Sequence, residues 1–166
     1  MVQALSIKTK LIMAMLALVG SVALMGATAD DAHAGVTELR TVYNYTGKTV
    51  YIWNHESGSL KLIYPGSNVF LNQWVPWCAG STDFYRGKYI EVGYIESGVK
   101  VHKYSIWQQN RNGQDRIRYT KLRGYDPYAQ PMPGASGVDG RRDLVLSNLD
   151  AAATSYSTGV RLYYGQ

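Results

Sequence analysis

One fifteen-residue segment, residues 73–87, holds the side chains of this chain that are best suited to binding a ligand. Its aromatic and polar members are Trp74, Trp77, Asp83, Tyr85 and Arg86. Aromatic faces stack on the apolar side of a sugar ring, and neighbouring polar groups bond its hydroxyls, as in many small-ligand sites. The segment therefore predicts a glycan-binding loop. The same residues would also suit an apolar loop that folds over one end of the domain.

A second irregular segment, residues 123–142, contains seven glycines and prolines and has no hydrophobic periodicity. A segment of this length without secondary structure is unusual in a compact domain, so it is either functional or mobile. Tyr125, Asp126 and Tyr128 would extend the aromatic surface of the first segment. We predict that these three residues contribute to the same ligand site.

Residues that bind metals or catalyse reactions are sparse in this sequence. His55 and His102 are the only histidines beyond residue 34, and neither stands in a metal-ligand spacing. Asp139 and Asp143 could bind calcium together with backbone carbonyls, but their spacing fits no dedicated calcium loop. The sequence also lacks the serine-nucleophile, zinc-protease and phosphate-loop motifs. We therefore expect no metal, no cofactor and no enzymatic activity.

Two arrangements leave a small secreted hydrolase as a lower-ranked alternative. Cys78 and His102 could form a nucleophilic pair. A glycosidase needs two carboxylates on either side of a cleft. The candidates to face Glu91 are Glu56, Asp83 and Glu96. Glu91 and Glu96 are five residues apart, so on a regular strand their side chains point to opposite faces, which weakens that pair.

The composition favours surface binding over nucleic-acid binding. Seventeen Lys and Arg against twelve Asp and Glu give a net charge of +5, spread along the chain without a dense block. Such a charge attracts anionic surfaces weakly and is a poor fit to a dedicated nucleic-acid protein. The fourteen Tyr, four Trp and two Phe all lie beyond residue 34. These residues suit half-buried strands and wet binding surfaces.

The elements that position these side chains are predicted to be β-strands. Short apolar runs cover residues 36–46, 49–53, 60–64, 69–75 and 88–96. Short runs separated by turn residues are typical of an antiparallel sandwich or barrel. No part of the chain beyond residue 34 has a clear 3.6-residue apolar period. We predict an all-β fold, a single antiparallel β-sandwich or jelly-roll-like domain over residues 35–166.

The strongest local prediction is a β-hairpin around Asn112-Gly113. This pair is well suited to the positive φ angles of a type I′ turn, and the runs 99–109 and 114–122 flank it. Counting outward from the turn predicts three facing pairs: Arg111 with Gln114, Trp107 with Arg118, and Ile106 with Tyr119. The second would be a cation–π pair on one face, and the third a hydrophobic pair on the other.

Residues 1–34 have the pattern of a secretory signal peptide. Two lysines precede nineteen uncharged residues, and the small-x-small sequence Ala32-His33-Ala34 follows. We expect cleavage after Ala34, with cleavage after Ala29 as an alternative. An uncleaved anchor is a further alternative, because nineteen such residues can cross a bilayer. In every case the charges flanking the segment place the domain outside the cytoplasm.

Cys78 is the only cysteine, so the domain cannot form an internal disulfide. The thiol is either a small buried apolar group or a free group able to pair with another chain.

These observations favour a secreted, non-enzymatic module that recognises glycans or another extracellular surface through its aromatic loop. A membrane-active protein is the alternative, because exposed Tyr and Trp would sit at lipid headgroups and the positive charge would favour anionic lipid. A purely structural role in an envelope or matrix is also compatible with the sequence.

Overall fold

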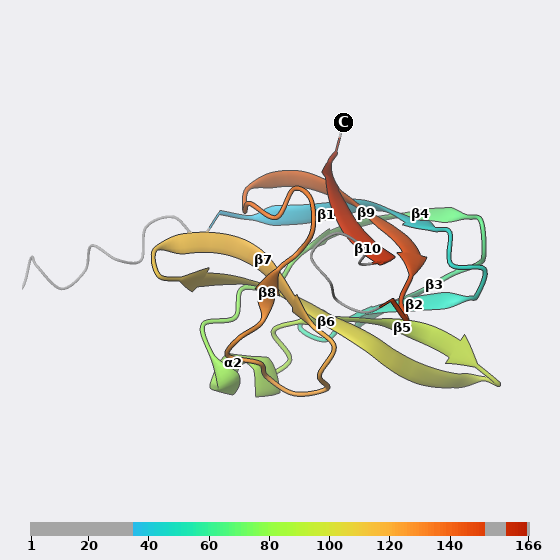
Figure 1. Ribbon diagram of the computed structural model, residues 1–166, viewed down its shortest axis with the longest axis horizontal. Coiled ribbons are helices and arrows are strands. Elements are labelled where there is room, and N and C mark those ends of the chain that lie inside the picture. Colours follow the sequence, from blue (N-terminus) through green and yellow to red (C-terminus); the bar gives the residue numbers. More distant parts are fainter. Residues whose placement is uncertain (1–34, 152–158, 166) are drawn as a thin grey trace, which may run out of the picture. The chain divides into compact units, whose positions relative to one another are not determined.

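Ten β-strands and one short helix, shown in Figure 1, make up the part of the chain that the structure describes. The structure is a computed structural model, and it describes residues 35–151 and 159–165. The elements are β1 (Thr37–Asn44), β2 (Val50–Asn54), β3 (Ser59–Ile63), β4 (Asn68–Trp74), α2 (Ser81–Tyr85), β5 (Ile90–Glu96), β6 (Val99–Arg111), β7 (Gln114–Thr120), β8 (Gln130–Pro131), β9 (Gly140–Asn148) and β10 (Gly159–Tyr164). The predicted signal peptide, with both of its cleavage sites, lies outside the described residues.

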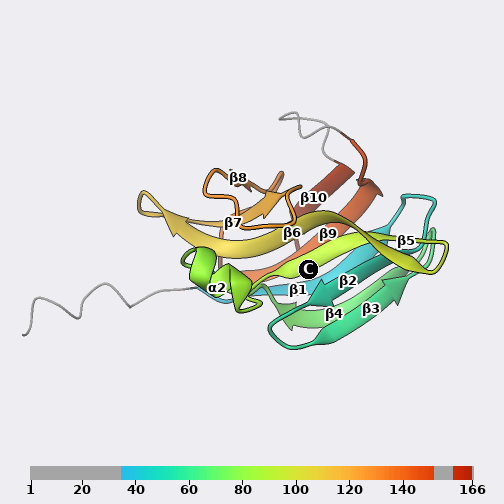
Figure 2. The same cartoon turned by 90° about the horizontal axis from the view of Figure 1, so that it is seen from below.

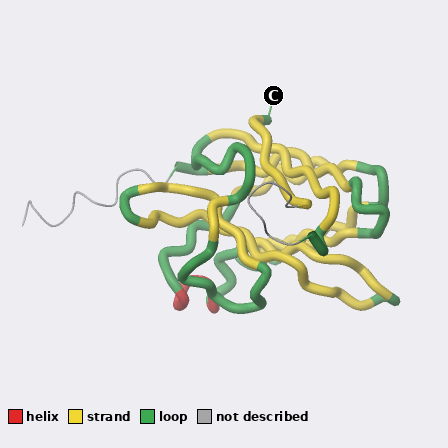
Figure 3. The backbone as a smooth tube through the Cα atoms, in the orientation of Figure 1, coloured by secondary structure: helices red, strands yellow, loops and turns green. Residues whose placement is uncertain are grey.

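The strands form two sheets, which confirms the predicted all-β sandwich. One sheet has the order β10-β9-β1-β4, and the other has the order β3-β2-β5-β6-β7-β8. In Figure 1 the labels β1, β4 and β9 lie above β2, β3, β5 and β6. Apolar side chains that alternate along the strands fill the space between the sheets, including Leu39, Leu144, Ile52 and Ile106. Figure 3 shows that the regular structure of the described chain is almost entirely strand, joined by loops.

One strand pair departs from the antiparallel prediction. Strands β1 and β9 run parallel, whereas the other seven strand pairs are antiparallel. Parallel neighbours need a long crossover connection. Here all six strands of the larger sheet lie between β1 and β9 in the sequence, so no local sequence pattern could predict the pairing.

The hairpin prediction is confirmed. Asn112 has φ 54° and Gly113 has φ 73°, as a type I′ turn requires. The predicted facing pairs are all present: Arg111–Gln114, Trp107–Arg118 and Ile106–Tyr119. Strand β6 is long enough to pair first with β5 and then with β7 (Figure 2).

The prediction of irregular structure is wrong over parts of both irregular segments. Residues 81–85 form α2, which is too short to show a helical apolar period and buries only Phe84. Residues 140–142 begin strand β9, where Arg142 points inward and donates hydrogen bonds to the carbonyls of Ala135 and Gly137. An arginine at an inward position hides the alternation of that strand.

Within the described residues, no helix is long and apolar enough to cross a membrane.

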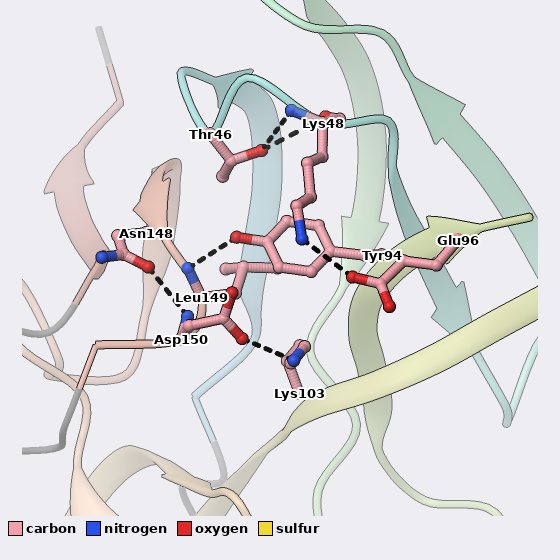
Figure 4. A network of polar contacts seen from close by, with 8 residues as sticks. All are labelled: Thr46, Lys48, Tyr94, Glu96, Lys103, Asn148, Leu149 and Asp150. Carbon is pink, nitrogen blue, oxygen red and sulfur yellow. Dashed lines mark hydrogen bonds and ion pairs between the residues drawn. The ribbon is translucent and has the colours of Figure 1, made fainter.

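A polar network ties the end of β9 to the six-stranded sheet (Figure 4). The Tyr94 hydroxyl on β5 accepts a buried hydrogen bond of 3.0 Å from the Leu149 amide. The Asp150 carboxylate pairs with Lys103 on β6, and the Asp150 amide donates to the Asn148 side chain. These contacts hold the two sheets together at the edge of the core.

Candidate ligand-binding site

The four-stranded sheet carries an open groove on the face that points away from the core. Its volume is about 780 Å³. The lining residues are Arg40, Thr41, Tyr43, Tyr45, Phe70, Asp143, Val145, Tyr163 and Tyr164. They come from all four strands of this sheet and from the residue that follows β1. We call this feature the aromatic groove.

A second hollow adjoins the aromatic groove on the same face. It measures about 380 Å³, and its lining residues are Val36, Glu38, Asn72, Trp74, Gly140 and Arg141. Glu38 lies two residues before Arg40 on β1, and Asn72 lies two residues after Phe70 on β4. In the pairing of β1 with β4, Glu38 of the second hollow faces Trp74, and Thr41 of the aromatic groove faces Phe70, so the two hollows are neighbours along these strands. Together they form one elongated surface with Trp74 at one end.

The rings of this surface are more exposed than apolar side chains usually are. Phe70 is 64% exposed, Trp74 is 50% exposed and Tyr164 is 73% exposed. Exposed aromatic side chains that gather in one patch are typical of binding surfaces. The indole nitrogen of Trp74 donates to the Glu56 carboxylate at 3.0 Å, which fixes the orientation of the ring.

A β-bulge in the middle of the sheet shapes the groove. Leu39 and Val42 are three residues apart, yet both point into the core, which the two-residue period of a regular strand does not allow. The pairing of β1 with β9 passes directly from Leu39–Arg142 to Thr41–Asp143, so Arg40 is an extra residue. A bulge kinks the strand and redirects side chains. Here it places Arg40 and Thr41 side by side in the lining of the groove.

The groove contains polar groups without protein partners. Among the described residues, the Arg40 side chain has no hydrogen bond or ion pair, although it is half-buried. The Oδ1 atom of Asp143 is buried and has no hydrogen-bond partner in the described part of the chain. Buried polar groups are normally paired, so unpaired ones in a groove are candidates for ligand contacts.

Only Trp74 of the predicted site residues lies on the aromatic-groove side of the molecule. Asp83 is engaged within its own loop, where it accepts a hydrogen bond from the Ala79 amide and pairs with Lys88. The hydrogen bond from Ala79 and the charge of Lys88 lower the pKa of the Asp83 carboxyl. Arg86 lies exposed at the end of α2.

The remaining predicted residues gather around a small aromatic core. Phe84 and Trp107 are buried there together with Cys78 and Ala129, and Tyr125 packs against them. Because Trp107 alternates with the core residue Ile106, this cluster lies on the side of the six-stranded sheet that faces away from the main core.

The exposed parts of the two predicted segments are separate from this small core. Tyr85 is 74% exposed and Tyr128 is 78% exposed, whereas Trp77 is half-buried. Asp126 accepts hydrogen bonds from Thr120 and from the Tyr128 amide. The two segments therefore meet around buried rings, and apart from Trp74 on the groove side only Tyr85 and Tyr128 of these segments offer large aromatic surface to a ligand.

A network around Glu91 lies on the same side of the six-stranded sheet. The carboxylate accepts a 2.5 Å hydrogen bond from the Tyr51 hydroxyl and lies 2.9 Å from Nε2 of His55. Burial acts to raise the pKa of Glu91, but the hydrogen bonds from Tyr51 and His55 outweigh burial and hold the pKa below its usual value. The Tyr51 ring lies directly over Gly93, where there is no room for a side chain.

The pairs considered for a hydrolase are engaged elsewhere. The carboxylates proposed to face Glu91 each have another partner: Glu56 with Trp74, Asp83 with Lys88, and Glu96 with Lys48. Cys78 is buried, and burial raises the pKa of its thiol to about 11, so the thiol stays protonated at neutral pH. His102 lies 3.1 Å from the hydroxyl of Ser105.

The described residues do not contain three His, Cys, Asp or Glu side chains grouped as a metal site, Asp139 and Asp143 included. No known protein family matches this chain, and searches of curated proteins and of solved structures found no similar protein.

The aromatic groove was missed in the sequence because its residues lie in strands. Tyr43 near the end of β1 and Tyr45 just after it stack at 6.3 Å between ring centres, and Phe70 and Trp74 are both exposed on β4. Exposed aromatic residues on two strands were therefore visible in the sequence. The sequence did not show that these two strands are neighbours in the sheet.

Proposed function

We propose that this chain is a secreted, non-enzymatic binding protein that recognises a glycan through the aromatic groove. The observation that carries the proposal is the open groove of exposed rings on the four-stranded sheet. Aromatic faces suit the apolar faces of sugar rings, and the unpaired groups of Arg40 and Asp143 suit their polar substituents. The pattern of residues 1–34 supports secretion.

The surface is long enough for several sugar units. Phe70 and Trp74 face Thr41 and Glu38 of β1, which are three positions apart, so the two rings are anchored roughly 10 Å apart along the sheet. This separation exceeds the length of a single pyranose ring, so the surface suits an extended chain of sugars better than a free monosaccharide.

A glycan array or a polysaccharide pull-down with the purified protein tests the proposal. Phe70→Ala removes an exposed ring from the groove, and it should weaken binding about tenfold, the typical cost of truncating an aromatic anchor. Tyr85→Ala is the matched control, because it removes an equally exposed ring from the predicted loop. Loss of binding in Tyr85→Ala but not in Phe70→Ala would move the site to the loop. Undetectable glycan binding by the folded protein would refute the proposal.

Contact with a lipid surface is a second candidate function. The edge strand β3 exposes Leu60 and Leu62 with Lys61 between them, and the exposed Tyr64 follows. Apolar and tyrosine side chains beside a lysine suit the interface of an anionic membrane. A vesicle sedimentation and leakage assay tests this function, and a protein that neither binds nor permeabilises anionic vesicles would exclude it.

A further inference from the structure

We infer that the glycan held in the aromatic groove is acidic, with one carboxylate on a sugar unit bound by Arg40. This inference rests on the proposed function and adds the chemical class of the ligand.

The first argument is the position of Arg40. The bulge adds this residue to β1 and directs its side chain into the groove, where the described residues give it no carboxylate partner. By contrast, Arg141 on β9, which lines the second hollow, forms an ion pair with Glu38 at 3.2 Å. An unpaired guanidinium presents a planar fork of donors that matches a carboxylate in a two-bond geometry.

The second argument is the charge around the groove. Arg161 lies 5.6 Å from the ring centre of Tyr163, which lines the groove. Together with Arg40 it places two positive groups in or beside the groove, whereas Asp143 is the one carboxylate of its lining. The field of these groups favours an anionic ligand.

The third argument is the presence of Asp143 itself. Its unpaired Oδ1 atom can accept a hydrogen bond from a sugar hydroxyl. The combination of rings, one unpaired arginine and one carboxylate therefore fits a polyuronic acid, in which each sugar carries hydroxyl groups and a single carboxylate.

The test compares polygalacturonate with its fully methyl-esterified form, which keeps the sugar backbone and removes the charges. Affinity is measured by titration calorimetry or affinity electrophoresis of the purified protein. We expect the wild type to bind the acidic polymer at least about tenfold more tightly, and Arg40→Gln to lose about ten- to a hundredfold for that polymer alone. Arg123→Gln is the matched control, because it removes the same charge from an exposed position on another part of the surface.

The failure of the inference and that of the proposed function are distinguishable. Equal binding of both polymers by the wild type, or an equal loss in Arg40→Gln and Arg123→Gln, would overturn the acidic ligand. Phe70→Ala should weaken both polymers alike, and unchanged binding of both in this variant would instead overturn the groove as the site. Arg40→Lys keeps the charge without the fork and should show an intermediate loss. If Arg40→Gln does not fold, as judged by its thermal midpoint, the binding of Arg40→Lys decides the outcome.

Discussion

Gly93→Ala should destabilise the protein strongly, because a methyl group has no space at this position. A Cβ atom on residue 93 would lie 2.1 Å from the Val101 carbonyl oxygen and 2.7 Å from Cε1 of the Tyr51 ring. Real Cβ atoms essentially never show contacts this short, so both the backbone of β6 at Val101 and the Tyr51 ring have to shift. Tyr51 is fully buried, and its hydroxyl bonds the Glu91 carboxylate, so the movement also breaks that hydrogen bond.

The expected loss of stability combines two effects. Overpacking a well-filled site costs about 1–3 kcal/mol, and losing a hydrogen bond to a charged group costs about 1.5–3 kcal/mol. Gly93→Ala should therefore lower the free energy of unfolding by about 2.5–6 kcal/mol, a large share of the roughly 5–15 kcal/mol of a typical domain. For a domain of this size the corresponding fall in Tm is about 10–24 °C.

Urea and thermal unfolding of the purified variant measure this effect. Gly137→Ala is the control, because the nearest atom to its added Cβ would be the Arg116 guanidinium at 4.0 Å. We expect the control to stay within about 0.5 kcal/mol of the wild type. Tyr51→Phe removes only the hydroxyl, and its loss should be smaller than that of Gly93→Ala. A loss below about 1 kcal/mol in Gly93→Ala would refute the packing argument.

Four further predictions concern pH, the thiol and the hairpin. The pKa of Glu91 is lowered in the folded protein, so the stability that Glu91 contributes is present above pH 4.5 and is lost as the pH falls through the folded pKa. Glu91→Gln should therefore flatten this part of the curve of unfolding free energy against pH. An unchanged slope in the variant would contradict the prediction. Burial lowers the pKa of His102 from 6.5, so the unfolded chain takes up this proton first and stability falls as the pH drops below about 6.5; His102→Gln should remove that step. Cys78 should react with a thiol reagent at pH 8 only when the protein unfolds, because the thiol is buried with a pKa of about 11, and rapid labelling of the native protein would be inconsistent with this. Gly113→Ala, at φ 73°, should cost about 1 kcal/mol in denaturant unfolding without changing the sheet register, and a stabilised variant would argue against the type I′ turn.

The sequence predicts what local chemistry determines. Turn residues and two-residue alternation predict the first seven strands to within a few residues, and Asn112-Gly113 predicts the register of the β6–β7 hairpin. These features depend on neighbours in the chain, so a single sequence contains the necessary information.

The candidate site depends on contacts between residues far apart in the chain, which the sequence does not predict. Tyr43 and Tyr163 line one groove because β9 lies between β1 and β10 in the sheet, although 120 positions separate the two residues. The bulge that adds Arg40 appears in the sequence only as two core residues with the wrong spacing. The predicted loop, in contrast, gathers its aromatic residues within fifteen positions, and half of them pack against each other.

The parallel pairing of β1 with β9 also determines the order in which the two sheets can form. Strands β5, β6 and β7 follow one another in the chain and pair in that order, so the larger sheet closes mostly through short loops. The smaller sheet joins the first strand of the domain to its last two, and contacts of such high sequence separation are slow to form. We therefore expect the groove to be completed after the larger sheet, and a chain that stops before residue 140 would leave one side of β1 as an open edge. The groove exists only when β1 has come together with β9 and β10, so its presence requires strands from both ends of the described chain.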